Sequence, residues 1–162
     1  MPNHCHNRVT FYAHHSDDEK KSREQIAKIK AIFEDEAIFT HFIPEPDWPN
    51  TPLLTSDKHY GTKYGNDGEL PVKEEDPWTR YVFKSTGITD QRWYDWRLVN
   101  WDTKWDAYDV EVTDDDPDQL EVTFNTAWCP PDAICHAMRE LYPDLSVSWF
   151  YDEPGCEIAG YL

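Results

Sequence analysis

The sequence is poor in glycine and lacks the short motifs that carry most catalysis. It holds 6 glycines in 162 residues, with no G-x-S-x-G turn, no Walker A loop and no G-x-G-x-x-G loop. A phosphate-binding loop needs glycine where the backbone approaches the phosphate closely. Carboxylate pairs for glycoside hydrolysis stay open as an alternative, because an acidic chain offers many pairs and none stands out. We therefore expect a protein that is not an enzyme and needs no cofactor.

Long apolar runs and paired cysteines are also missing. No segment approaches the run of about 18 apolar residues that a membrane span needs, and the first residues do not resemble a signal peptide. The four cysteines stand at positions 5, 129, 135 and 156, a scatter that fits reduced thiols better than a disulfide framework. We expect a cytoplasmic location and no membrane partner.

Metal binding is an alternative with two weak candidates. The possible zinc ligands near the N-terminus are His4, Cys5, His6, His14 and His15. Adjacent side chains of this kind do not readily point at one ion, and no C-x-x-C pair is present. The other candidate is a calcium loop, but residues 114–118 lack the alternating ligands and closing glutamate of an EF-hand. The sequence favours no metal.

Basic residues are scarce in the C-terminal part of the chain. Residues 101–162 contain 15 acidic residues against Lys104 and Arg139, a net charge of −13 within a total of −17. A field of this sign repels nucleic acid and anionic membranes and attracts basic protein surfaces. Contacts with phosphate need Lys and Arg. We therefore expect a basic protein partner and no direct contact with nucleic acid.

Aromatic residues are abundant, at 15% with eight Trp, which argues against a disordered chain. At this length a single domain over 1–162 is expected. Alternating patterns predict strands and 3.6-residue patterns predict helices. The predicted strands are 8–13, 107–113, 119–126, 145–151 and 156–162, and the predicted helices are 17–35 and 131–142. Ser16 and Glu19 form a capping box at the start of the first helix.

The stretch from about 43 to 88 shows no sustained period and is predicted to be a loop-rich, irregular insertion. A short strand is expected within it at 81–83. Thr89 is the expected N-cap of a short helix that carries Trp93, Trp96 and Val99. The alternation in the next strand places Tyr108, Val110 and Val112 on the core side.

The order of these elements predicts an α+β fold of ferredoxin-like type, with both long helices on one face of an antiparallel sheet. Residues at apolar positions of the patterns should be largely buried. They are Val9, Phe11, Ile29, Phe33, Val110, Val122, Phe124, Ile134, Met138 and Val147.

Five motifs resemble a known family. They are 1–5 (MPNHC), 42–46 (FIPEP), 96–109 (WRLVNWDTKWDAYD), 126–131 (TAWCPP) and 151–155 (YDEPG). Together they resemble the YubB-type proteins of plasmids and phages. The resemblance implies a ferredoxin-like domain and carriage on mobile elements, in a family of unknown function. Two residues depart from the family pattern: His4 stands where Trp is usual, and Asp102 where Gly is usual.

Residues 93–109 concentrate Trp and Asp. Trp beside carboxylates and Asn100 suits a protein recognition face. We favour a different interpretation, in which Trp93, Trp96 and Trp105 fill the open face of the sheet, because aromatics at helical spacing are usually core.

A predicted hairpin at 107–126 gathers carboxylates on its non-core face and in its turn. Like charges that face each other across strands destabilise a sheet, so folding alone gives no reason to place them there. Two interpretations stay open, a surface that imitates nucleic-acid phosphates and a surface that only confers solubility. The predicted partner-binding residues are Asp102, Asp106, Asp109, Glu111, Asp114, Asp115, Asp116, Asp118 and Glu121.

The charge distribution favours a non-enzymatic inhibitor from a phage or plasmid. It would occupy, as a nucleic-acid mimic, a basic groove of a host defence protein of the restriction or CRISPR type. The alternative is a ferredoxin-like protein that binds or processes nucleic acid directly, as sheets with exposed aromatics often do. A metal-dependent enzyme or housekeeping domain is a third possibility.

Overall fold

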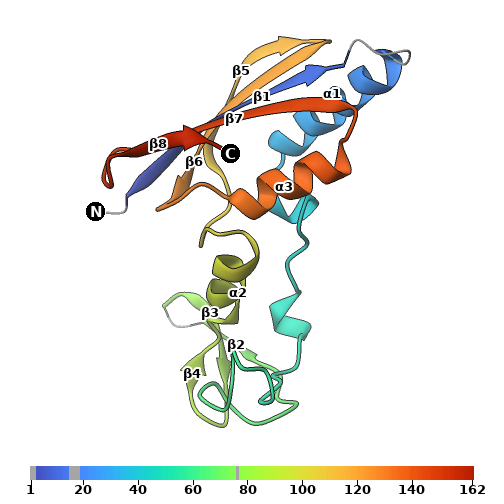
Figure 1. The fold of residues 1–162 in the computed structure, drawn as a ribbon. Coiled ribbons are helices and arrows are strands. Elements are labelled where there is room, and N and C mark those ends of the chain that lie inside the picture. Colours follow the sequence, from blue (N-terminus) through green and yellow to red (C-terminus); the bar gives the residue numbers. More distant parts are fainter. Residues whose placement is uncertain (1–2, 15–18, 76) are drawn as a thin grey trace. The chain divides into compact units, whose positions relative to one another are not determined.

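The computed structural model describes residues 3–14, 19–75 and 77–162, and its contacts divide the chain into two compact units (Figure 1). The first, here called the sheet unit, comprises Met1–Pro44 and Asn100–Leu162. The second, the inserted unit, comprises Glu45–Val99. None of the helices in the described residues has the length and apolar character needed to cross a membrane.

The sheet unit is built on five antiparallel strands in the order β5-β6-β1-β7-β8. The strands are β1 (His4–Ala13), β5 (Tyr108–Asp116), β6 (Gln119–Ala127), β7 (Leu145–Glu153) and β8 (Ile158–Tyr161). Helix α1 (Glu19–Phe33) lies between β1 and β5, and α3 (Asp132–Leu141) lies between β6 and β7. The resulting βαββαβ order is ferredoxin-like, with β8 added beyond β7. The predicted fold class is confirmed.

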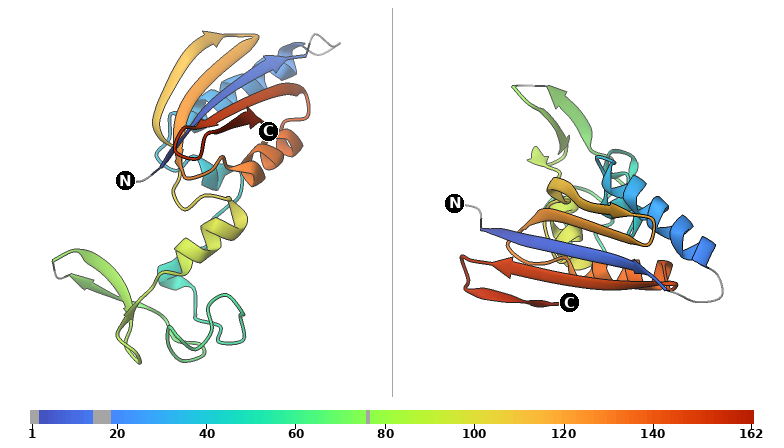
Figure 2. Two further views of the ribbon diagram at one scale, coloured as in Figure 1. Left: turned by 60° about the vertical axis from the view of Figure 1, so that its left-hand side comes forward. Right: turned by 90° about the horizontal axis from the view of Figure 1, so that it is seen from above.

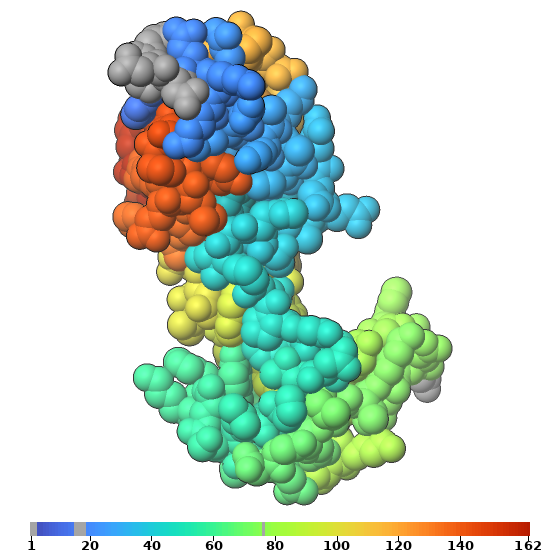
Figure 3. Space-filling view, turned by 90° about the vertical axis from the view of Figure 1, so that its right-hand side faces the viewer, coloured from blue at the N-terminus to red at the C-terminus, as the bar shows by residue number. Residues whose placement is uncertain are grey.

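Both helices cover the same face of the sheet, as the two views of Figure 2 show. The space-filling view from the helix side shows the surfaces of α1 and α3 next to each other (Figure 3). Ile29 of α1 and Ile134 of α3 are both fully buried. The N-terminal end of the predicted first helix, with its capping box at Ser16, lies outside the described residues.

Eight of the ten residues predicted for the core are buried, and two are only half-buried. Val110 lies beside an irregularity in β5, between the paired positions Tyr108 and Glu111. Val147 lies on the part of β7 that has no partner in β8, because that pairing begins at Phe150. The side chains at both positions are therefore less buried than they would be in a regular, fully paired sheet.

Strand β5 differs from its predicted form in one respect that matters for the surface. Its pairing with β6 shifts register twice, between Tyr108 and Glu111 and again between Val112 and Asp114. Each shift inserts one residue and changes which side chains face the core. Tyr108, expected on the core side, therefore lies opposite Asn125 on the face away from the helices.

The inserted unit contains more regular structure than its sequence pattern indicated. It has β2 (Val72–Glu75), β3 (Thr79–Phe83), β4 (Ile88–Thr89) and α2 (Arg92–Asn100), besides the 3₁₀ turn η2 (Trp48–Asn50). The short strand expected at 81–83 is confirmed within β3. Leu53, Tyr64 and Phe83 form a small core. The guanidinium of Arg92 is buried, paired with Asp90 at 2.8 Å.

The prediction that Thr89 caps α2 is wrong. Thr89 belongs to β4, and the Asp90 carboxylate accepts the backbone N–H of Arg92 instead (3.1 Å). The Asp90 carboxylate therefore accepts one of the backbone N–H groups that have no partner within the helix, as an N-cap side chain does.

Candidate functional site

The face of the sheet opposite α1 and α3 carries no helix of the sheet unit among the described residues, and we call it the open face. Side chains alternate between this face and the core along each strand. On β5 and β6 it presents a group of carboxylates that we call the carboxylate row. Its members are Asp109, Glu111, Asp114, Asp116 and Glu121.

The register shifts in β5 bring this row together. Regular alternation from Glu111 would direct Thr113 and Asp115 to the open face. The shift between Val112 and Asp114 instead places Asp114 directly opposite Glu121, and Asp116 opposite Gln119. Directly opposed side chains have Cβ atoms about 4.5–5.5 Å apart, and like charges in such a pair are destabilising. The open face thus holds a like-charge pair that folding does not favour.

Hydrogen bonds to other side chains are described for three carboxylates of the row. In each case the donor is a neutral amide or hydroxyl and not a cation. The bonds run from Asn125 to Asp109 (3.1 Å), from Gln119 to Asp114 (2.6 Å), and from Thr113 (2.8 Å) and Thr10 (3.2 Å) to Glu121. An amide or hydroxyl fixes the orientation of a carboxylate and leaves its negative charge uncompensated. These bonds orient Asp109, Asp114 and Glu121 without placing a cation beside them.

Two of the predicted partner-binding residues have cationic partners on α1 instead. Asp115 pairs with Lys30 (2.6 Å), and Asp118 makes two bonds with Arg23 (2.7 and 3.0 Å). These carboxylates raise the pKa of both cations, first through the hydrogen bonds and then through charge attraction. Asp115 and Asp118 therefore tie the hairpin to the helix, and each has a cationic partner there.

Two further predicted residues are used by the fold outside the sheet. Asp102 accepts the backbone N–H of Ala133 (2.9 Å) in the first turn of α3, and Asp106 accepts the N–H of Phe39 (3.0 Å). Asp102 also has a φ of +62°, a conformation that glycine adopts most easily. The nine residues of the predicted partner-binding face therefore divide into the five of the carboxylate row, two paired with α1 and two that brace loops.

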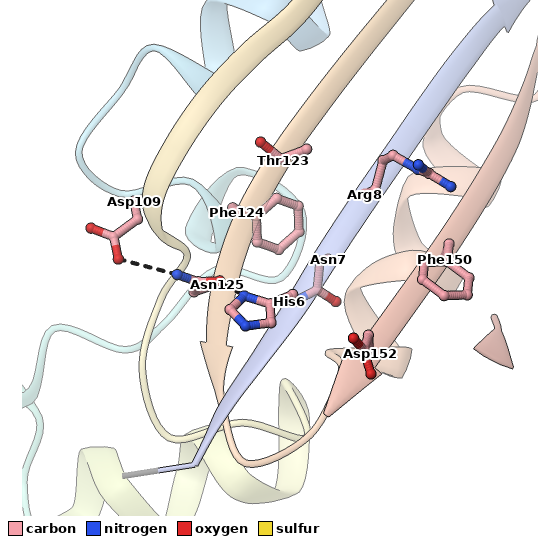
Figure 4. A pocket seen from close by; sticks show the side chains of 9 residues that line it. All are labelled: His6, Asn7, Arg8, Asp109, Thr123, Phe124, Asn125, Phe150 and Asp152. Carbon is pink, nitrogen blue, oxygen red and sulfur yellow. Dashed lines mark hydrogen bonds between the residues drawn. The ribbon is translucent and has the colours of Figure 1, made fainter. Parts of the chain in front are cut away.

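The row adjoins a shallow pocket of about 450 Å³ on the open face (Figure 4). Asn125 donates to Asp109, so its carbonyl oxygen accepts from Nδ1 of His6 at 2.6 Å. This bond leaves Nε2 of a neutral His6 as an acceptor. The Arg8 guanidinium lies 5.5 Å from the centre of the Phe150 ring and makes no ion pair with any described residue.

No motif in the sequence indicated this pocket. The sequence marked His6 only as a possible zinc ligand and gave no role to Arg8 or Asn125. The alternation of β1 and β6 does place all three on one face, so the signal was present in the two strands. Their proximity depends on the pairing of residues more than a hundred positions apart, with His6 opposite Asn125.

An aromatic cluster lies where β5 begins, between the loop at 101–107 and the loop that follows β6. It comprises Trp105, Tyr108 and Trp128, and the ammonium group of Lys104 lies beside both tryptophan rings. Lys104 Nζ lies 4.3 Å from the ring centre of Trp105 and 5.3 Å from that of Trp128. The Tyr108 hydroxyl is hydrogen-bonded to Nδ1 of His4 (2.6 Å), and burial, then the charge of Asp109, raises its pKa.

Trp128 has a φ of +79°, and the residue is 55% exposed. A bulky residue in the left-handed region is a true outlier and costs about 1–3 kcal/mol. Because the indole is exposed, its burial offsets little of this strain. Local packing therefore does not account for tryptophan at this position.

The favoured interpretation of the Trp segment is wrong in its location. Trp93 and Trp96 belong to α2 of the inserted unit, where Trp96 packs against Trp48 (6.4 Å) and Trp93 lies under Arg97 (5.2 Å). Trp105 belongs to the sheet unit but is 38% exposed. Helical spacing correctly grouped the first two, but it could not indicate which core they would join.

The described residues of the chain are 3–14, 19–75 and 77–162. No three His, Cys, Asp or Glu side chains in these ranges converge as they would around a metal ion.

The fold and the open face define an α+β protein with a ferredoxin-like domain. Residues 100–162 match the family model described as the ferredoxin-like domain in Api92-like protein. A solved structure, that of protein api92 from Yersinia pseudotuberculosis, is similar over 99% of this chain and 93% of its own, at 10% identity and a TM-score of 0.49. No curated protein matches the sequence. Neither description states a function.

Proposed function

We propose that this protein is an acidic, non-enzymatic inhibitor whose carboxylate row imitates nucleic-acid phosphates and occupies a basic groove of another protein. The observation that carries the proposal is the opposed pair of Asp114 and Glu121, each held by neutral donors. A fold that only needed solubility could have spread its charges. This one opposes two of them and fixes their orientation.

The spacing of the row fits a phosphate backbone. Side chains two apart on a strand are separated by about 6.8 Å, close to two steps of about 3.4 Å along one DNA strand. Asp114 and Asp116 are related in this way on the open face, and Glu111 continues the row beyond the register shift. Successive Lys and Arg side chains of a groove that binds phosphates at this spacing would pair with successive carboxylates of the row.

The resemblance to YubB-type proteins of plasmids and phages supplies the biological setting of the proposal. A mobile element gains from blocking host proteins that act on its DNA. The partner we propose is therefore a basic nucleic-acid-binding protein of host defence, of the restriction or CRISPR type, met in the host cytoplasm. The protein itself would need no cofactor and would not touch nucleic acid.

One observation favours a second candidate, direct binding of nucleic acid on the same open face. Arg8 is stacked on Phe150, and Phe150 contacts Tyr161 (5.3 Å between ring centres), which is 70% exposed. Aromatic rings beside a cation suit unstacked bases. Asp152 and the carboxylate row lie on the same face and oppose phosphate, so we rank this candidate second.

The test compares two triple variants that change the net charge equally. One reverses the row with Glu111→Lys, Asp114→Lys and Asp116→Lys. The control reverses three exposed carboxylates elsewhere in the sheet unit, Glu34→Lys, Glu36→Lys and Glu140→Lys. Each is used to capture basic proteins from a host extract at low salt, followed by stepwise salt elution.

The proposal expects a nucleic-acid-binding protein that the wild type and the control retain and that the row variant loses, by about tenfold or more at low salt. The wild-type complex should dissociate as salt rises, because exposed charge pairs are screened. Equal loss of the partner by both variants would show that only total charge matters, and full retention by both would show that these carboxylates are not needed; either result would contradict a specific face.

A further inference from the structure

The aromatic cluster is continuous with the carboxylate row. Tyr108, at the start of β5, lies on the open face, and Asp109 of the row follows it. The Trp105 and Tyr108 rings contact each other edge to face, with centres 6.2 Å apart. The row and the cluster therefore form one surface along β5, with charge toward the hairpin turn and indole rings at the other end.

Hydrogen bonds hold the backbone at and beside Trp128, although its indole is exposed. Thr103 donates its hydroxyl to the carbonyl of Ala127 (3.0 Å), and the thiol of Cys129 lies 2.7 Å from the carbonyl of Asp102. The backbone N–H of Trp128 donates to the carbonyl of Asn3 (3.0 Å). Both neighbours of Trp128 are thus fixed, and the fold directs its indole outward in a conformation that glycine would adopt more easily.

The faces of both indoles already attract a cation. Lys104 is one of two basic residues in 101–162, and it makes no ion pair with any described residue. Its ammonium group instead lies over Trp105 and Trp128. An arginine side chain suits such a site better, because its planar guanidinium stacks on aromatic rings and is more weakly hydrated.

We propose that the aromatic cluster is an arginine-binding site that anchors the basic partner. Lys104 occupies this site in the free protein, and an arginine of the partner displaces it. This inference rests on the proposed function, since it names the side chain that the same surface receives. Asp109 lies beside the cluster with one carboxylate oxygen bonded to Asn125, and its other oxygen can accept from the incoming guanidinium.

The site predicts opposite effects for two substitutions. Trp128→Gly removes one indole wall and should weaken binding about fivefold, while the melting temperature stays unchanged or rises because the left-handed backbone suits glycine. Lys104→Gln removes the competing cation and its repulsion, and should tighten binding about twofold to threefold. Trp78→Gly is the matched control, because this Trp is 80% exposed in the inserted unit, and it should change nothing.

The probe is a fluorescently labelled 12-residue peptide of alternating arginine and glycine, with binding followed by anisotropy at low salt. A 12-nucleotide thymidine strand is measured in parallel, because bases also stack on indoles. All variants are compared with the wild type and with the triple variant of the carboxylate row.

Weaker binding by Trp128→Gly together with tighter binding by Lys104→Gln supports the arginine site. If neither substitution changes peptide binding while the row variant loses it, the inference is wrong and the proposed function stands. If the row variant also binds as the wild type does, both are wrong. Binding of the thymidine strand that both substitutions weaken would overturn the inference in favour of base stacking.

Discussion

Asp114 and Asp115 are neighbours in β5, yet removing one negative charge from each should change stability in opposite directions. Asp114 lies on the open face, directly opposite Glu121. Asp115 lies opposite Leu120 and pairs with Lys30 of α1 at 2.6 Å. Asparagine at either position keeps the shape of the side chain and removes its charge.

The Asp114→Asn change removes the repulsion between two directly opposed like charges, which should stabilise the fold by about 0.2–1 kcal/mol. The new amide oxygen can still accept from Gln119, so no hydrogen bond need be lost. For a chain of this length the melting temperature should rise by about 1–3 °C. The Asp115→Asn change breaks the ion pair with Lys30 and should lower it by about 1 °C.

Thermal unfolding of both variants at 0.05 M and 1 M salt measures this contrast. The two shifts should differ in sign at low salt and shrink together at 1 M, where the screening length falls to about 3 Å. If both variants gain stability equally, relief of total charge governs the effect. The register of β5 would then have no energetic consequence, and the reasoning from the opposed pair would be refuted.

Three further predictions follow from single residues. Asp102→Ala should destabilise by about 1–2 kcal/mol in chemical denaturation, but Asp102→Gly much less, because glycine tolerates the +62° φ. A thiol reagent at pH 8 should modify the exposed Cys156 first, and should reach Cys5 and Cys135 only when the protein unfolds. Burial raises the pKa of the Cys5 and Cys135 thiols to about 11, so few of them are reactive thiolates at that pH. Hydrogen bonds from Ser85 lower the pKa of Glu69 below its ordinary value of 4.5. The ionised Glu69 therefore stabilises the fold above pH 4.5, and this stabilisation is lost as the pH falls through the pKa of the folded state. In thermal melts from pH 5 to 2, Glu69→Gln should remove this pH dependence.

The fold could be predicted from the sequence where patterns are long and regular. Strands β1, β6 and β7 alternate without interruption, and α3 follows a double proline, so both their type and their inward faces were predictable. The inserted unit was not, because its strands have two to five residues and its buried Arg92 depends on partners up to 44 positions away. Periodicity cannot register contacts of that kind.

The candidate site was predictable in composition but not in arrangement. The sequence showed that carboxylates gather in the hairpin, and the structure divides them according to whether α1 supplies a cation. Two inserted residues in β5 decide which face Asp114 and Tyr108 occupy, and a strict two-residue alternation gives no sign of them. The left-handed backbone of Trp128 likewise has no signature in the sequence.

The most direct measurement of phosphate mimicry is a competition on the isolated partner. The partner is held at fixed concentration with a labelled DNA duplex that it binds, and this protein is added at constant salt while complexes are separated by size. Mimicry predicts that DNA leaves the partner as this protein binds, with no species containing all three, and that the row variant displaces far less DNA than the control variant. A stable ternary complex, or equal displacement by both variants, would contradict the account.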